Sequence, residues 1–333
     1  MKKPYFLLPV IVFLAFSCST DKDIQRIFGI SAKAPVFLNC LPVSSTEIVF
    51  KFSHPVRLVS FHMEPMEPAI GAVSAEEGDE VKITFSAPLG EGKKFTADIL
   101  VEDSNRNSLN VIVPFRSRNN RMPALVFNEL RFDNSGSNHK AEFIEFKALG
   151  SGNLGAMRLF IAHQSVSEPF YEFPPAEVKA GEYIVLHLRT TEEGCLDETG
   201  QNLGLSKGVE AEASARDFWI PGSKKLLHNT NGLWLLDQDG KIIDAVLLSE
   251  TADLAGLSAA LARTFTAAAE FLDGKKAWPS PAPTDAVITK GTTNTRTLCR
   301  DENIPHQRRA ENWYITATSS ATPGKSNNPK RYN

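Results

Sequence analysis

Three glutamates, Glu129, Glu142 and Glu145, are the residues whose type and spacing come closest to a catalytic arrangement. Two carboxyl groups held about 5–9 Å apart can hydrolyse a glycosidic bond, one as general acid and the other as nucleophile or base. In the alternative, the strands that carry these acids use them for hydrogen bonds within the fold or expose them to solvent. The second interpretation is preferred, and we predict no catalytic residue.

The other residues suited to acid–base or metal chemistry are scattered. The sequence contains no H-E-x-x-H pair, no G-x-S-x-G nucleophile turn and no clustered Cys/His spacing. We therefore expect neither a metal site nor a cofactor. The seven histidines occur singly, at His54, His62, His139, His163, His187, His228 and His306.

Acidic residues gather in one segment, where Asp237, Asp239 and Asp244 are close enough in sequence to suggest calcium. The segment lacks the ligand spacing and the final glutamate of an EF-hand loop. Turns between paired strands are rich in Asp and Gly for backbone reasons. A structural use of the three aspartates is the preferred interpretation.

Two tryptophans beside prolines are candidates for a contact surface, Trp219 in RDFWIPG and Trp278 in KKAWPSPAP. Exposed aromatic rings can bind a protein partner or a sugar. Core packing or the anchoring of a loop is the preferred alternative. Four basic pairs are interpreted as solvated surface, namely Lys224-Lys225, Lys275-Lys276, Arg308-Arg309 and Lys330-Arg331.

The elements that position these residues follow an N-terminal export signal. Lys2 and Lys3 precede the apolar run PYFLLPVIVFLAF, which is shorter than the ~20 residues that span a bilayer as a helix. The segment AFSC that follows resembles the lipobox of bacterial lipoproteins, although Leu14 stands four residues before the cysteine instead of three. The resemblance implies cleavage after residue 17, a diacylated Cys18 and a tether over 18–33. The alternative is an ordinary secretory signal.

The net charge argues against one class of partner. Removal of residues 1–17 takes away Lys2 and Lys3 and lowers the formal charge from −3 to −5. Proteins that bind nucleic acids broadly rely on basic patches that neutralise phosphates. We therefore do not expect nucleic acid as a partner.

Short alternating segments fill residues 34–117. TEIVFKF places Ile48, Phe50 and Phe52 on one face, and the same alternation recurs over 81–85, 95–101 and 109–115, between turn signals such as SHP, EEGD and DSNRN. The pattern predicts the antiparallel strands of a β-sandwich. The segments EIVFKFSHPV, PLGEGKKFTADI and VEDSNRNSL resemble the bacterial Ig-like domains of surface proteins, with Arg106 where Gly is usual. The resemblance implies a spacer or adhesive module.

A polar linker over 118–123 leads to a second strand-rich region. ALVFNELRF, AEFIEF and EYIVLHL are predicted strands, and NGLWLLDQDGKIIDAVLL is a predicted hairpin that turns at Asp239-Gly240. Over 251–273, leucines and alanines recur at three- and four-residue steps, which predicts a helix that ends at Asp273-Gly274.

Five segments of this region resemble, in order, the lamin-tail domain, an Ig-like β-sandwich of nuclear lamins and of many bacterial secreted and envelope proteins. They are Asn128-Glu129-Leu130, Phe143-Ile144-Glu145-Phe146, Gly181 to Leu186, Gly232 to Asp244, and Asn312-Trp313 with Thr322 to Asn327. The resemblance covers 124–328. The helix near 251–273 and the long stretch at 189–229 depart from the pattern, and we interpret 189–229 and 251–285 as insertions that carry a protein-specific role.

Cysteine placement suggests one cross-link. Cys195 and Cys299 both fall in the second region, so a disulfide between them is the first choice in an oxidising compartment. Cys40 is then left as a small buried hydrophobic residue.

Together these features predict an all-β protein with two Ig-like β-sandwich domains in tandem, the second with a short helical insertion. We expect a protein that is lipid-anchored to a bacterial membrane, at the outer membrane, the periplasmic face or the surface. We expect it to bind or scaffold an envelope protein or glycan without catalysis. The alternative is a carbohydrate-binding or hydrolase accessory protein of the envelope that uses Glu129 and Glu145 or the region of Trp219 and Trp278.

Overall fold

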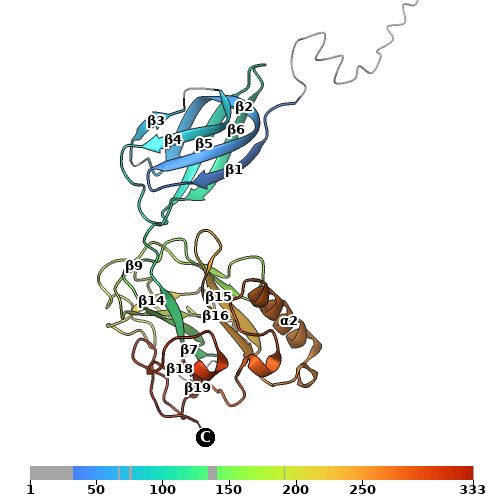
Figure 1. Ribbon diagram of the computed structural model, residues 1–333. Coiled ribbons are helices and arrows are strands. Elements are labelled where there is room, and N and C mark those ends of the chain that lie inside the picture. Colours follow the sequence, from blue (N-terminus) through green and yellow to red (C-terminus); the bar gives the residue numbers. More distant parts are fainter. Residues whose placement is uncertain (1–32, 67, 75–76, 134–140, 191, 333) are drawn as a thin grey trace, which may run out of the picture. The chain divides into compact units, whose positions relative to one another are not determined.

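The computed structural model describes residues 33–66, 68–74, 77–133, 141–190 and 192–332. The predicted export signal and Cys18 lie outside these residues. The chain divides into two compact β-rich units (Figure 1), the first comprising residues up to 41, 47–86 and 96–115. The second comprises residues 42–46, 87–95 and those from 116 onward. The predicted fold class, all-β with two sandwich domains and a helical insertion, is confirmed.

The first unit is a sandwich in which one long strand belongs to both sheets. Its strands are β1 (Phe37–Pro42), β2 (Glu47–Glu64), β3 (Ile70–Val73), β4 (Gly78–Phe85), β5 (Lys94–Glu102) and β6 (Ser108–Arg116). The first part of β2 pairs with β4 and its second part pairs with β5. The predicted turn at SHP is wrong, because the register shift between Lys51 and Val56 lets the strand pass through Pro55 without a turn.

The turn before β6 is held by one aspartate. Asp103 Oδ1 accepts hydrogen bonds from the backbone N–H groups of Asn105 and Asn107, each at 2.9 Å. Arg106 has φ of 65°, a left-handed conformation that favours glycine. The residue that departs from the Ig-like pattern therefore occupies the position where the turn geometry requires a glycine-like backbone.

The second unit is built from two larger sheets. The six-stranded sheet has the order β14 (Arg216–Trp219), β13 (Tyr183–His187), β8 (Phe143–Ala148), β7 (Leu125–Arg131), β18 (Leu298–Arg300) and β19 (Trp313–Ile315). The five-stranded sheet has the order β11 (Tyr171–Glu172), β10 (Arg158–Ile161), β15 (Asn231–Leu236), β16 (Ile242–Ser249) and β17 (Val287–Ile288). A separate pair joins β12 (Glu177–Val178) to β9 (Gly152–Asn153). The predicted hairpin is β15–β16, and Gly240 in its turn has φ of 79°.

Side chains that alternate along the strands fill the space between the two sheets. Ile144 and Phe146 contribute from β8, and Leu233 and Leu235 contribute from β15; all four are completely buried. The ring of Phe146 packs edge-on against Phe173 at a centroid distance of 5.7 Å. Because β8 alternates, Phe143, Glu145 and Lys147 point to the opposite face of the six-stranded sheet.

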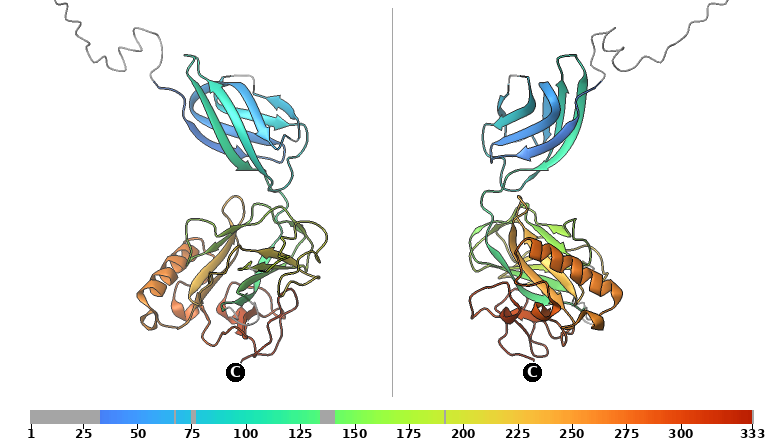
Figure 2. Two further views of the ribbon diagram at one scale, coloured as in Figure 1. Left: turned by 180° about the vertical axis from the view of Figure 1, so that it is seen from behind. Right: turned by 45° about the vertical axis from the view of Figure 1, so that its right-hand side comes forward.

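The helix α2 (Ala259–Gly274) covers the outer face of the five-stranded sheet (Figures 1 and 2). Trp234 of β15 stacks on Phe271 of the helix at 4.4 Å. A Cβ at Gly232 would lie 2.5 Å from the Cβ of Ala268, so glycine permits this close approach. The helix begins later than predicted, because Leu254–Gly256 forms a 3₁₀ turn and Ser258 caps α2 by accepting from the N–H of Leu261.

The stretch at 189–229 extends the six-stranded sheet. Its strand β14 pairs in parallel with β13, from Ile184 opposite Arg216 to His187 opposite Trp219. Besides the 3₁₀ turn at Leu254–Gly256, two short 3₁₀ helices lie in the described part of the unit, at Pro283–Asp285 and Ala310–Asn312.

Candidate functional site

Two of the three candidate acids face each other across neighbouring strands. Glu129 of β7 is in register with Glu145 of β8, and both side chains are completely buried. They point away from the core between the sheets. A register shift between Phe127 and Glu129 brings Asn128 toward the same face, where it bonds to Glu145.

Glu129 is surrounded by donors from distant parts of the chain. It accepts hydrogen bonds from Thr297 Oγ1 at 2.5 Å and from the backbone N–H and Oγ1 of Thr322, both at 3.1 Å. Burial raises the pKa of Glu129, against the opposing effect of these hydrogen bonds.

Glu145 is bonded at both carboxyl oxygens. Oε1 accepts from Asn128 Nδ2 at 2.7 Å and Oε2 accepts from the backbone N–H of Gly324 at 2.6 Å. Arg300 Nη2 donates to Asn128 Oδ1 at 3.0 Å, which fixes the orientation of that amide. Burial, together with the nearby charge of Glu129, raises the pKa of Glu145 well above its ordinary value.

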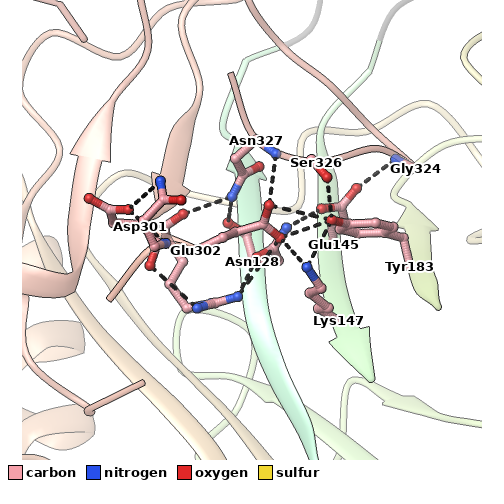
Figure 3. A network of polar contacts seen from close by, with 11 residues as sticks. Asn128, Glu145, Lys147, Tyr183, Asp301, Glu302, Gly324, Ser326 and Asn327 are labelled. Carbon is pink, nitrogen blue, oxygen red and sulfur yellow. Dashed lines mark hydrogen bonds and ion pairs between the residues drawn. The ribbon is translucent and has the colours of Figure 1, made fainter. Parts of the chain in front are cut away.

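A further network of polar contacts lies beside Glu145 (Figure 3). Glu302 accepts from Lys147 Nζ at 2.9 Å and from Tyr183 Oη at 3.0 Å. Burial alone would raise the pKa of Glu302, but the hydrogen bonds from Lys147 and Tyr183 hold it below its ordinary value. Asn327 Nδ2 donates to the carbonyl oxygens of Asn128 and Arg300, at 3.0 and 2.8 Å.

These contacts bind the C-terminal segment to strands β7, β8 and β18. We call Thr322, Gly324 and Asn327 the C-terminal clasp. Gly324 has φ of 78°, and a Cβ there would lie 2.7 Å from Glu212 Cβ. The clasp leaves the oxygens of Glu129 and Glu145 bonded within the protein, so in this structure neither carboxyl group is available to a substrate.

The third acid, Glu142, is separate from the pair. It lies three residues before Glu145, so strand alternation directs it to the other face of the sheet. Its carboxylate accepts from the N–H groups of Leu226 and Leu227 at 2.9–3.0 Å. Burial raises the pKa of Glu142 to about 7. The preferred interpretation of the three acids, a structural role, agrees with this geometry.

Neither candidate contact tryptophan is exposed. Trp219 is 8% exposed; its ring stacks on His187 at 3.9 Å and its Nε1 donates to Ser206 Oγ at 3.0 Å. Trp278 is 4% exposed, and its Nε1 donates to the carbonyl oxygen of Asp285 at 3.0 Å. The hypothesis of an exposed contact surface at these rings is wrong, because each anchors a loop against the core.

The predicted disulfide is also wrong, since Cys195 and Cys299 are both free thiols. Gly208 packs against both Trp219 and the sulfur of Cys195, which places Cys195 beside β14. Cys299 is buried in β18, and three strands separate β18 from β14. At about 4.8 Å per strand this is roughly 19 Å, whereas disulfides join Cα atoms less than about 7 Å apart. Cys40 is half-buried, and burial raises its pKa to about 12.

Two of the three aspartates of the hairpin accept hydrogen bonds from the backbone, and the third, Asp239, pairs with the side chain of Arg118 at 2.5 Å. Asp237 Oδ1 accepts from the N–H groups of Asp239 and Lys241, at 2.9 and 2.8 Å. Asp244 is completely buried and accepts from the N–H of Phe127 at 2.8 Å. In the part of the chain that the structure describes, no cluster of three or more His, Cys, Asp or Glu side chains could hold a metal ion.

Sequence reasoning missed two groupings. His187 Nε2 and Asp217 Oδ1 form a buried pair at 2.7 Å between β13 and β14, a parallel pairing that the intervening loop concealed. In addition, the basic pairs at 275–276 and 308–309 lie together: Lys276, Arg308 and Arg309 line one surface hollow with His306 and Trp278. Each pair was visible in the sequence, but their proximity was not.

No helix in the described ranges is long and apolar enough to cross a membrane. Cys18 lies outside those ranges.

One curated relative shares sequence with part of this chain. The chain is 33% identical over 146 residues to an uncharacterized protein of Treponema pallidum (strain Nichols). The matched stretch covers 42% of this chain and 35% of the relative. The matched region thus spans about a third of that relative's length.

Two solved structures are weakly similar to this chain. The N-terminal part of the bacterial S-layer protein SbsC is 18% identical with a TM-score of 0.25, over 49% of this chain and 42% of that one. A DUF4876 family protein from Bacteroides thetaiotaomicron is 12% identical with a TM-score of 0.27, over 80% and 88% of the two chains. Neither likeness bears on function.

A family model matches a larger part of the chain than the curated relative does. The family model described as "TP_1001_2nd: protein second domain" matches residues 123–315, which is more than half of the chain. The protein therefore belongs to the family defined by this TP_1001-type second domain.

Proposed function

We propose that this protein is a lipid-anchored binding or scaffolding module of the bacterial cell envelope and not an enzyme. One observation carries the proposal: Glu129 and Glu145, the acids best suited to catalysis, are buried and bonded to the C-terminal clasp. Catalytic carboxyl groups must reach the substrate. Here the same groups hold the last segment of the domain in place.

The resemblance to lamin-tail domains supports a binding role. Its motif segments correspond to β7, β8, β13, the β15–β16 hairpin and the C-terminal clasp, which are elements of one sandwich. Glu129 of the N-E-L segment and Glu145 of the F-I-E-F segment accept hydrogen bonds from the clasp. These two segments and the C-terminal motif therefore form one hydrogen-bond network. The resemblance implies an interaction module, and the helix and β14 are the elements that depart from the lamin-tail pattern.

The alternative of a carbohydrate-binding or hydrolase accessory protein has less support. Its candidate residues were Glu129, Glu145, Trp219 and Trp278, and all four side chains are buried. An assay of purified protein on cell-wall glycan tests the difference. We expect no release of reducing ends, whereas release that Glu145→Gln abolishes without loss of thermal stability would establish a hydrolase.

The anchor is tested in cells with Cys18→Ser. We expect the wild-type protein to incorporate a fatty-acid label and to sediment with membranes, because acyl chains provide membrane attachment without a spanning helix. The variant should lose the label and remain in the supernatant. Equal labelling and sedimentation of the two proteins would contradict attachment through Cys18.

A further inference from the structure

Two segments that are distant in sequence line one surface hollow of the second unit. Residues 276–279 follow α2 and residues 306–309 follow β18, and together they line a largely open hollow of about 480 Å³. Small-molecule sites typically measure about 300–1,000 Å³. The exposed Pro279 contributes apolar surface, and the exposed Lys276 and Arg309 contribute positive charge. Ala277 and Trp278 are buried behind this lining.

The positive charge of this hollow is only partly neutralised, by Asp244, which bonds to both His306 and Arg308. Arg308 Nε lies 3.3 Å from Asp244 Oδ1, and its Nη2 donates to the carbonyl oxygen of Ile243 at 2.8 Å. Asp244 therefore balances Arg308. Lys276 and Arg309 form no ion pair with any residue that the structure describes. Glu311 lines a neighbouring hollow with Arg309, beyond ion-pair distance.

Lys276 also occupies a backbone position that normally favours another residue. It has φ of 53°, in the left-handed region, at the end of α2 where glycine or asparagine is usual. A left-handed conformation costs an ordinary residue about 1 kcal/mol. The N–H groups of Lys276 and Ala277 already cap the helix by donating to Asp273 and Leu272, at 2.8 Å each. Because glycine would form the same backbone bonds with less strain, the lysine side chain itself requires an explanation.

We propose that the hollow binds a phosphate monoester through Lys276 and Arg309. This inference rests on the proposed binding function and names its ligand class. A guanidinium group binds two phosphate oxygens at once, and an ammonium group adds a second, freely oriented cation. The two cations match the charge of nearly −2 on a phosphate monoester at pH 7. The exposed ring of Pro279 beside them is available to the organic part of the ligand.

The test is calorimetric titration of the full chain with inorganic phosphate, glycerol 3-phosphate, glucose 6-phosphate and glucose. We expect the phosphate esters to bind with Kd below about 1 mM, more weakly at high salt, and glucose not to bind. Tighter binding of glycerol 3-phosphate identifies a lipid that ends in a phosphate monoester as the source, and tighter binding of glucose 6-phosphate identifies a sugar phosphate.

Three variants make the result specific. Lys276→Gly and Arg309→Gln should each weaken ester binding at least tenfold, and Lys276→Gly should keep or raise Tm because it relieves the left-handed strain. Lys224→Gln, which removes one charge elsewhere on the surface, should bind as the wild type does. Absence of ester binding, or equal affinity in all four proteins, would overturn the inference.

The outcomes also separate this inference from the broader proposal. Turnover of a bound ester would support the hollow as a site and overturn the non-enzymatic function. Failure to bind any ester, with no activity on cell-wall glycan and with lipid attachment through Cys18 intact, would overturn the phosphate site and leave the proposed function standing.

Discussion

Glu129 and Glu145 stand opposite each other across β7 and β8, fully buried, yet their partners differ in kind. Glu145 faces N–H groups that can only donate, from the Asn128 amide and Gly324. Glu129 also accepts from one backbone N–H, that of Thr322, but its other partners are the hydroxyl groups of Thr297 and Thr322, which can donate or accept. Burial and the charge of Glu129 raise the pKa of Glu145 further than that of Glu129, which favours the proton on Glu145. The partners argue for the opposite assignment, because only Glu129 faces groups that can accept a hydrogen bond from a protonated carboxyl group, and we place the shared proton on Glu129 for this reason.

This difference predicts unequal effects of two isosteric substitutions. Glu129→Gln should lower the free energy of unfolding by about 1 kcal/mol or less, because its amide can donate to a threonine hydroxyl. Glu145→Gln should cost about 2–4 kcal/mol, because its NH₂ group opposes an N–H donor. Urea unfolding of both variants at pH 7 measures the difference. A larger loss for Glu129→Gln would place the proton on Glu145 instead.

Glu142 predicts a pH dependence of stability. In the fold its pKa is about 7, above the ordinary value of 4.5. Between these two values the folded state retains a proton that the unfolded state has released, so the free energy of unfolding decreases as pH rises from 4.5 through 7. The effect is on the order of 3 kcal/mol.

The measurement compares the wild type with Glu142→Gln. The glutamine keeps an acceptor for Leu226 and Leu227 and does not titrate, so the difference in stability between the two proteins should change across this pH range. A constant difference from pH 4.5 to 8 would show that Glu142 ionises as freely in the fold as in the unfolded chain.

The surroundings of Gly324 predict that adding a single methyl group there lowers the free energy of unfolding strongly. Gly324→Ala combines a left-handed φ with a Cβ placed 2.7 Å from Glu212 Cβ, and it should lower stability by about 2–4 kcal/mol. Gly181 is a matched control, because it has φ of 86° and no neighbour within 4 Å. Gly181→Ala should cost about 1 kcal/mol. Equal losses in thermal unfolding would mean that the clasp tolerates displacement.

The three described cysteines predict a distinct labelling pattern. Burial raises the pKa of the Cys299 thiol well above its ordinary value and raises that of Cys40 to about 12. Because the thiolate is the reactive form, alkylation of the folded protein at pH 7.5 should be slow at Cys40 and Cys195 and undetectable at Cys299. All three should react in urea without reductant. A non-reduced peptide that joins Cys195 to Cys299 would contradict the free thiols.

The strands were predictable where alternation was clear. Phe50, Ile83 and Phe146 lie in predicted strands and are completely or almost completely buried. The strand β14 was not predicted, because it has only four residues and pairs in parallel across a long connection. Strand periodicity is local, and it does not record which distant segments become neighbours.

The candidate site shows the same limit. The sequence marked Glu129 and Glu145, but the fact that decides their role is the C-terminal clasp, which lies almost two hundred residues further along. Likewise, the sequence marked Lys275-Lys276 and Arg308-Arg309 as separate solvated pairs, whereas the fold places Lys276 and Arg309 on one hollow. The predicted pairing of Cys195 with Cys299 was wrong for the same reason, because two cysteines in one domain need not lie on neighbouring strands.

The clasp has a consequence for how the second unit is made. Asn327 bonds to Asn128 across 199 positions, so this closure is among the slowest to form by chain diffusion. Until residue 327 has left the ribosome, the two acids near the start of the unit lack their last partners. A nascent chain should therefore remain loosely packed through most of its synthesis, and the unit should acquire its native stability in one late step.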